Sequence, residues 1–331
     1  MKLITFLLTT LTFSSCNLHQ ETGMLPELLM LKPNTQQVTS SSGTSTIKSL
    51  TLFPNQINNL QLWLEGDALS LASGTKVASW TDKSANGFHA TQGTVGQQPT
   101  FMDNLFNGKP GLRFTDGNPG TNLTLGANYL FSTNDGITIV AVGRSAVYNA
   151  SLKFIFDFGG FAGAGYGLIY SATDGSGGNN VVMYSSGDVG GVSTQGKYLS
   201  TTSDIVLIIA RLKFAPATDK EQTIHTNGSW LATNSSGLTL TQLSFNEICE
   251  FPLRGGGNNG ATPTGCTNNN VNGPVTIGGQ SKTGGQANRF FAGDIAMVLF
   301  YDKAITETER IGLECYASEK YGITISHGCT E

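Results

Sequence analysis

The end of the chain reads as one strand followed by one helix, and this pair constrains the fold more than any other stretch. Residues 295–301, IAMVLFY, form a β-rich apolar run that is too short for an ordinary helix. Thr306, with Glu309 three positions later, matches a capping box and predicts a helix start. Apolar residues at three-to-four spacing then form one stripe. Gly322 predicts a left-handed end to this helix.

The composition favours many short strands over a helical enzyme core. The 331 residues include 42 glycines, and Ser, Thr and Asn are frequent throughout. Charged residues make up only 13% of the chain and the formal net charge is −4, so neither a basic nucleic-acid face nor a polyanionic tail is indicated. We therefore expect no nucleic-acid partner. Because all-β sandwiches often exceed about 200 residues, the length allows one large domain.

The N-terminus predicts export and a lipid anchor. Met1-Lys2 and the apolar stretch 3–13 match a signal peptide, which is too short for a transmembrane helix of about 20 residues. Phe13-Ser14-Ser15-Cys16 resembles a bacterial lipobox, so residues 1–16 are predicted to end at an acylated Cys16. The alternative is an ordinary signal peptide with an incidental cysteine. Several acyl chains on Cys16 would give a stable anchor in membrane lipid. Asparagine instead of aspartate directly after the cysteine, at position 17, resembles the pattern in lipoproteins that are sorted to an outer membrane. The expected location is the bacterial cell envelope, at the outer membrane or cell surface.

Residues 17–55 are predicted to be a flexible tether. This stretch is rich in Ser and Thr between Val38 and Ser49 and lacks the apolar surface that would offset its ordering entropy. The folded domain is expected over residues 56–331. It shows neither an internal repeat at solenoid periods nor coiled-coil heptads.

Two tryptophans and a group of turn residues characterise the first part of this domain. Trp63 and Trp80 lie within apolar alternation, so both are expected in the core and not as platforms for a sugar. Asp82 and Ser84 predict Asx-type turns, and Asn86-Gly87 predicts a type I′ turn. Further along, hairpins are expected around residues 174–180 and around the Asn-Gly pair at 227–228.

These motifs resemble LamG-like modules of the concanavalin A-like lectin/glucanase superfamily. The resemblance rests on W-x-D-x-S-x-N-G at 80–87, G-K-P-G-L-R-F at 108–114, the hairpin at 222–232 and the closing strand and helix. It covers about Leu60 to Ile325 and implies an all-β, two-sheet jelly-roll sandwich with a short C-terminal helix. About a dozen short strands fit this architecture. The segment 250–273 departs from the family pattern, and is either a passive surface loop or a specialised binding loop.

Four cysteines besides Cys16 predict disulfides. An even number in an exported chain argues for pairing, and three connectivities are possible. We favour the sequence-local pairs Cys249–Cys266, closing the Gly/Asn-rich loop, and Cys315–Cys329, tying the C-terminal tail to the last helix. Each would contribute roughly 3 kcal/mol. A zinc site is disfavoured, because the chain has no C-x-x-C and its four histidines are scattered.

No catalytic constellation is recognisable. Glycosidases of this superfamily carry E-x-D-x-E on one strand, which places the carboxylates on one face. Glu65-Gly66-Asp67 lacks the second glutamate, Glu307-Thr308-Glu309 belongs to the predicted helix start, and Glu247 and Glu250 would face opposite sides of a strand. No G-x-S-x-G is present. The chain is therefore expected to be non-catalytic, with a polysaccharide-degrading enzyme as the alternative.

Calcium is the one cofactor that the resemblance suggests. LamG-like modules often bind Ca²⁺ at a sheet rim through Asp and Asn side chains, which suit a hard cation. The candidates Asp116, Asp157, Asp174 and Asp188 lie in or near Gly-rich loops. The alternative is that they are ordinary turn residues.

Together these features predict a surface lipoprotein whose LamG-like module recognises a glycan or an extracellular-matrix protein. The alternative is a structural envelope lipoprotein without a small-molecule ligand. An exposed aromatic patch on one rim would favour binding, whereas a rim of Gly, Ser and Asn would favour the structural role. No ligand-binding residue can be selected from the sequence.

Overall fold

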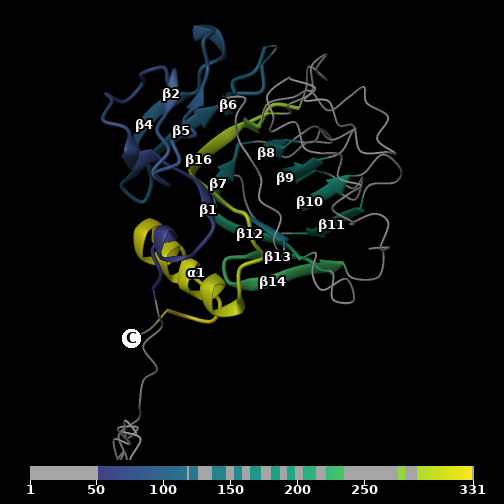
Figure 1. Ribbon diagram of the computed structural model, residues 1–331. Helices are drawn as coiled ribbons and strands as arrows, with labels where there is room; N and C mark the ends of the chain where they lie inside the picture. Colours follow the sequence, from purple (N-terminus) through teal and green to yellow (C-terminus); the bar gives the residue numbers. More distant parts are fainter. Residues whose placement is uncertain are drawn as a thin grey trace, which may run out of the picture. The chain divides into compact units, whose positions relative to one another are not determined.

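The described residues form two antiparallel sheets with one α-helix at the end of the chain (Figure 1). The computed structural model describes residues 51–117, 119–125, 136–146, 153–158, 165–172, 180–186, 192–197, 204–213, 221–234, 275–279 and 289–329. All of them belong to one unit, Thr46–Glu331. The all-β sandwich with a C-terminal helix that the sequence predicts is confirmed.

The first sheet is organised around its closing strand. In order, it contains β14 (Ser229–Asn234), β13 (Glu221–Thr226), β12 (Val206–Lys213), β7 (Gly136–Ser145), β16 (Gly293–Tyr301), β5 (Lys109–Phe114) and β4 (Thr100–Phe106). The eighth strand, β1 (Leu60–Glu65), also pairs with β16. β16 pairs with β7 along one side, and with β5 and then β1 along the other. The strand predicted from the end of the sequence is thus central.

The second sheet lies against the first. In order, it contains β11 (Val192–Lys197), β10 (Asn180–Ser186), β9 (Gly165–Ala172), β8 (Phe154–Phe158), β15 (Thr276–Ile277), β6 (Leu123–Leu125), β3 (Ala90–Thr91) and β2 (Ser79–Trp80). β9 and β10 form the hairpin predicted around residues 174–180. Three short 3₁₀ helices, η1 (Pro54–Gln56), η2 (Gly66–Ala68) and η3 (Val95–Gln97), lie in the first part of the domain.

A large apolar core fills the space between the two sheets. It includes Trp80, Phe114, Phe156 and Phe300, all fully or almost fully buried. The rings of Phe156 and Phe300 stack across the two sheets with centroids 5.7 Å apart. The expectation that Trp80 is a core residue is confirmed, because it has no exposed surface and its indole N–H donates to the Glu65 carbonyl at 2.8 Å.

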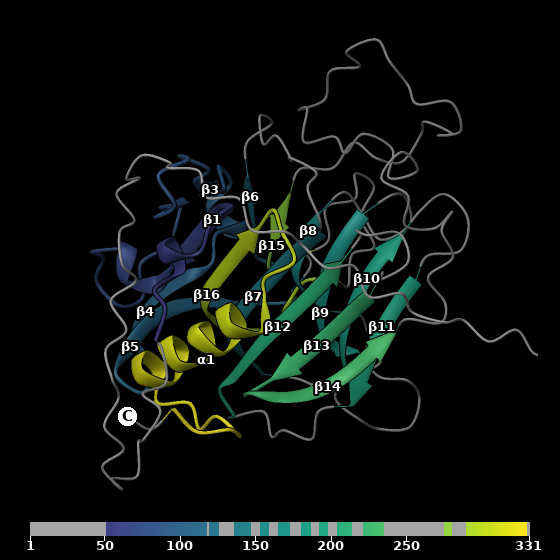
Figure 2. The same cartoon turned by 60° about the horizontal axis from the view of Figure 1, so that its bottom comes forward.

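The helix α1 (Glu307–Tyr321) covers the outer face of the first sheet (Figure 2). It begins with the predicted capping box at Thr306 and ends at Gly322, whose φ is 65°. Its apolar side packs on outward-facing residues of β7, β12 and β16. β16 is therefore buried on both faces, which explains why its sequence is an unbroken apolar run instead of an alternating one.

The turn after Trp80 differs from the predicted type I′ turn. Left-handed φ angles occur at Ala85 (72°) and Gly87 (77°), not at Asn86. The Asn86 side chain instead donates to the carbonyls of Leu60 and Gln61. These hydrogen bonds hold the Asn86 side chain against β1, and the backbone around it does not form a type I′ turn. The Asn227-Gly228 turn has φ angles of 47° and 80°, as the sequence predicts.

The aspartate of the W-x-D-x-S motif, Asp82, has a structural role. It accepts hydrogen bonds from the backbone N–H groups of Trp63, Ser84 and Phe88. The aspartate is almost fully buried. It therefore fastens the loop after β2 to β1, and provides a structural role for this part of the motif.

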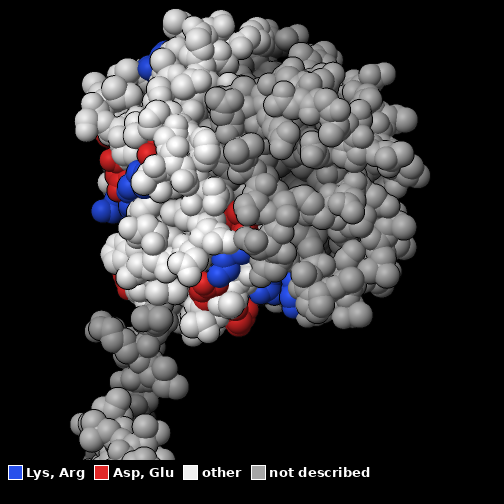
Figure 3. Space-filling model, in the orientation of Figure 1, with Lys and Arg blue, Asp and Glu red and all other residues white. Residues whose placement is uncertain are grey.

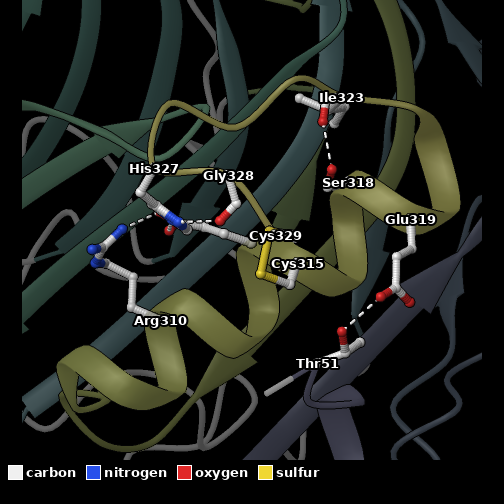
Figure 4. Close-up of a disulfide and its surroundings, with 10 residues drawn as sticks. Thr51, Arg310, Cys315, Ser318, Glu319, Ile323, His327, Gly328 and Cys329 are labelled. Atoms are coloured by element: carbon white, nitrogen blue, oxygen red, sulfur yellow. Dashed lines mark hydrogen bonds and ion pairs between the residues drawn. A yellow bond between two sulfur atoms is a disulfide. The ribbon is translucent and has the colours of Figure 1, made fainter. Parts of the chain in front are cut away.

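The C-terminal tail is fastened to α1 and to the β13–β14 turn. Cys315 and Cys329 form the disulfide that sequence-local pairing predicts, and Figure 4 shows it between α1 and the tail. The backbone N–H of Ser326 donates to the carbonyl of Asn227 at 2.9 Å. His327 contacts the buried Glu314 at 2.6 Å. Cys249 and Cys266 lie outside the described residues, as do Cys16 and the segment 250–273.

Candidate functional site

The described calcium candidates do not assemble into a metal site. Asp116 accepts from the buried Lys153 ammonium at 2.9 Å, and Asp157 is buried on β8. Asp174 and Asp188 lie outside the described residues. Within the described ranges, no group of three His, Cys, Asp or Glu side chains is placed to hold a metal ion.

The fragment Glu65-Gly66-Asp67, the nearest match to a glycosidase motif on a strand, serves to hold α1 on the sheet. The buried Glu65 carboxylate accepts from the hydroxyls of Tyr316 at 2.8 Å and Tyr321 at 2.9 Å, and lies 2.8 Å from the Lys320 ammonium. It also pairs with Lys83. Burial and the Glu65 carboxylate raise the pKa of both tyrosines, which therefore remain hydrogen-bond donors.

The second acidic residue of this fragment is neutralised by the same lysines. Asp67 lies 2.6 Å from Lys320 and 3.0 Å from Lys83. Burial alone would raise the pKa of Asp67, but the hydrogen bonds and charges of the two lysines lower it overall. Lys83 also lies 4.3 Å from the ring centre of Trp63, which belongs to the cluster under α1. These contacts form a structural network between β1 and α1.

A row of cross-strand neighbours leads from beneath α1 to an exposed tryptophan. Neighbouring pairs across β1, β16, β7, β12, β13 and β14 link Trp63, Leu299, Val140, Ile209, His225 and Trp230. Residues directly opposite each other lie on the same face of a sheet. The first four pack in the cluster under α1, His225 is 9% exposed, and Trp230 is 63% exposed.

Polar side chains of β12, β13 and α1 lie around the end of this row. Arg211 is the Cα partner of Thr223, one row away from His225, and donates to the Thr223 hydroxyl at 3.3 Å. From α1, Arg310 and Glu307 act electrostatically on His225. We call Trp230, His225, Thr223, Arg211, Glu307 and Arg310 together the Trp230 surface.

His225 is an uncharged hydrogen-bonding group at neutral pH. Burial, followed by the positive charge of Arg310, lowers the pKa of its imidazole to about 4. Arg211 acts in the same direction, while Glu307 opposes both. The imidazole next to Trp230 therefore offers polarity without charge.

We expect His225 to make the fold sensitive to acid. The unfolded imidazole titrates near pH 6.5 and the folded one near pH 4, so the unfolded chain binds the proton first. The stability that neutral His225 contributes is complete above pH ~6.5 and is lost as the pH falls through about 4, up to about 3 kcal/mol in total. Urea unfolding at a series of pH values should show a steeper loss for the wild type than for His225→Gln. Parallel curves for the two proteins would contradict this role.

Trp230 was not identified from the sequence as a candidate binding residue, although its place next to Leu231 on a predicted strand was a local signal. The neighbouring Leu231 packs against the core between the sheets. Alternation along a strand then directs Trp230 to the other face. Trp230 is exposed because α1 covers β16, β7 and β12 but does not reach β14. The sequence alone does not show where this coverage ends.

The comparisons with known proteins show a general likeness in architecture. No family model matches the sequence, and no curated protein is significantly similar to it. Similar solved structures include the Ruminococcus gnavus IT-sialidase CBM40 bound to α2,3-sialyllactose, at 16% identity over 55% of this chain and 83% of that chain, with a TM-score of 0.38. Domain 4 of AbnA, a GH43 extracellular arabinanase from Geobacillus stearothermophilus, in complex with arabinotriose, matches at 12% identity over 77% and 98%, with a TM-score of 0.47.

A third match is part of a larger protein. The Trypanosoma rangeli sialidase in complex with a difluoro-KDN ligand matches at 12% identity over 80% of this chain and 33% of that chain, with a TM-score of 0.44. At these identities and TM-scores, the matches carry no argument about a ligand or the position of a site.

Proposed function

We propose that this chain is a non-catalytic glycan-binding module of LamG-like type, held at the bacterial cell envelope by a lipid on Cys16. The observation that carries the binding role is the exposed indole of Trp230 at the end of an otherwise buried row. This side chain is 63% exposed, whereas its neighbour His225 is 9% exposed. A large aromatic side chain with this much exposed surface is a feature of binding sites.

The chemistry of the Trp230 surface suits a sugar. The C–H face of a sugar ring is apolar and packs on the electron-rich face of an indole. Hydroxyl groups at the rim of the sugar need polar partners, which Glu307 and His225 supply. Because Trp230 and His225 lie on paired strands, the platform is set on rigid elements.

A glycan fits this surface better than an extracellular-matrix protein does. Among the residues that the structure describes, the exposed large apolar side chains are Phe53, Leu71, Val95 and Trp230. They come from four separate parts of the fold. A stable protein interface buries about 800 Å² on each partner, whereas one aromatic ring with polar neighbours matches a ligand of a few sugar units.

The absence of catalysis in this proposal is supported by the carboxylates that most resemble a glycosidase motif, because other protein groups already bind them. Glu65 is buried among its partners and Asp67 is bound by two lysines. Glu309 is held by the capping box with Thr306 and by Lys303 at 2.9 Å. None of these carboxylates is left in the arrangement that a paired acid and nucleophile requires.

The anchor at Cys16 rests on the lipobox-like sequence. No helix within the described ranges has both the length and the apolar character needed to cross a membrane. Mass spectrometry of the mature protein from a bacterial host should find acyl chains on Cys16. An unmodified N-terminus, or cleavage elsewhere, would exclude the anchor while leaving the binding role standing.

Trp230→Ala is expected to weaken glycan binding about 10-fold or more, because the stacking platform is lost. The chain without the signal peptide and the lipidated cysteine, residues 17–331, would be applied to a glycan array, and the strongest ligand would then be titrated by calorimetry. Phe53→Ala is the matched control, since this ring is 53% exposed and packs edge-on against Tyr316. It should bind like the wild type.

Two results would count against the proposed function. Equal affinities for Trp230→Ala and wild type would remove Trp230 as the platform. An array without binding would instead favour a structural envelope lipoprotein.

A further inference from the structure

Each nitrogen of the β12 arginine at the Trp230 surface already donates to a protein group. The Arg211 guanidinium donates to the Thr223 hydroxyl at 3.3 Å, to the Ile305 carbonyl at 3.0 Å and to the Glu221 carboxylate at 3.1 Å. These three bonds engage all three of its nitrogens and three of its five N–H groups. An acidic ligand needs a free guanidinium fork for bidentate pairing, and would have to displace Glu221 to obtain one.

The second arginine is engaged more completely. Arg310 donates through two nitrogens to both oxygens of Glu307, and through the third to the buried Glu314. Its side chain is only 6% exposed. The Arg310 charge is thus balanced by two carboxylates within α1.

Acceptor groups, in contrast, remain accessible. The Glu307 side chain is 60% exposed, and a carboxylate has about four lone-pair sites, of which Arg310 occupies two. Glu221 is 33% exposed. Among the described residues on the face shown in Figure 3, acidic and basic side chains lie beside one another.

From this pairing of charges we propose that the Trp230 surface selects uncharged glycans and rejects acidic ones. The selectivity rests on the proposed function and adds the class of sugar to it. Accessible carboxylate oxygens accept the hydroxyls of a neutral sugar, whereas a carboxylate or sulfate on the sugar would meet Glu307 and find both guanidinium groups occupied. His225 adds no positive charge at neutral pH.

The test uses pairs of probes that differ only by an acidic sugar. Lactose with 3′-sialyllactose, N-acetyllactosamine with its sialylated form, and xylotriose with a glucuronic acid-substituted form would be titrated against residues 17–331. In the pairs that bind, we expect the neutral member to bind at least about 5-fold more tightly. Its Kd should change less than about twofold between about 20 and about 500 mM NaCl, because no ligand charge is there to be screened.

A charge variant links the selectivity to the named residue. Glu307→Gln is expected to raise the affinity for the acidic member severalfold, because it removes the accessible negative charge and frees part of Arg310. The neutral member should bind more weakly, because its hydroxyls lose a charged acceptor, so the preference for the neutral member falls. Glu319→Gln is the matched control on the same helix, where Glu319 accepts from Thr51. It should leave both affinities unchanged.

The outcomes separate this inference from the proposed function. If acidic members bind as tightly as neutral ones, or more tightly, and Trp230→Ala removes that binding, the selectivity is wrong and the glycan-binding role stands. A Glu307→Gln variant that leaves discrimination unchanged also overturns the selectivity. Equal binding by Trp230→Ala and wild type, or no binding in any pair, overturns the proposed function and the selectivity with it.

Discussion

Glu65→Ala is expected to lower the free energy of unfolding by about 3 to 5 kcal/mol. The buried carboxylate receives the hydroxyls of Tyr316 and Tyr321, and it is also the partner of Lys83 and Lys320. Its removal leaves two buried hydroxyls without an acceptor, and each such loss costs about 1–3 kcal/mol. The lysines are partly exposed and can regain water, so the tyrosines account for most of the effect.

Asp67→Asn provides the matched control for Glu65. Asp67 pairs with the same two lysines, but its side chain is 39% exposed. An exposed ion pair contributes at most about 1 kcal/mol. Urea unfolding of both variants, followed by tryptophan fluorescence and far-UV circular dichroism, should separate them clearly. Equal losses would show that the lysine charges hold α1 on the sheet, and not the bonds from the tyrosines.

Replacing Cys315 and Cys329 together by serine is expected to cost about 3 kcal/mol. The disulfide closes a loop between residues that are 14 positions apart. Without it, the unfolded chain regains the entropy of that loop. The tail is then held by contacts such as His327 with Glu314 and Ser326 with Asn227.

Ser318→Ala serves as the control for the tail. The Ser318 hydroxyl donates to the Ile323 carbonyl at 2.7 Å, so its loss removes one contact at the start of the tail and leaves the disulfide intact. It should cost about 1 kcal/mol. The unfolding midpoints of the double serine variant, the control and the wild type would be compared without reductant. A double variant as stable as the wild type would show that the tail contacts alone suffice.

Short stretches of sequence were sufficient for the local structure of several elements. The Thr306 and Glu309 pair predicted the start of α1, Gly322 its end, and Asn227-Gly228 the β13–β14 turn, and all three are present. Each depends on interactions between residues that are close in the chain, such as a side chain capping the N–H three positions later. The prediction of a two-sheet architecture around these elements came from the resemblance to LamG-like modules.

The candidate site depended on contacts between distant parts of the chain. Asn86 was expected in a type I′ turn, but bonds to Leu60 and Gln61 changed that turn. Glu65 belonged to the nearest, incomplete match to a glycosidase motif, and its structural role became visible only when packing of α1 placed it beneath Tyr316 and Tyr321. In the same way, Trp230 is exposed because α1 covers the row on β16, β7 and β12 and not its end on β14. Burial is set by which distant elements pack together, and neighbouring residues in the sequence carry little information about that.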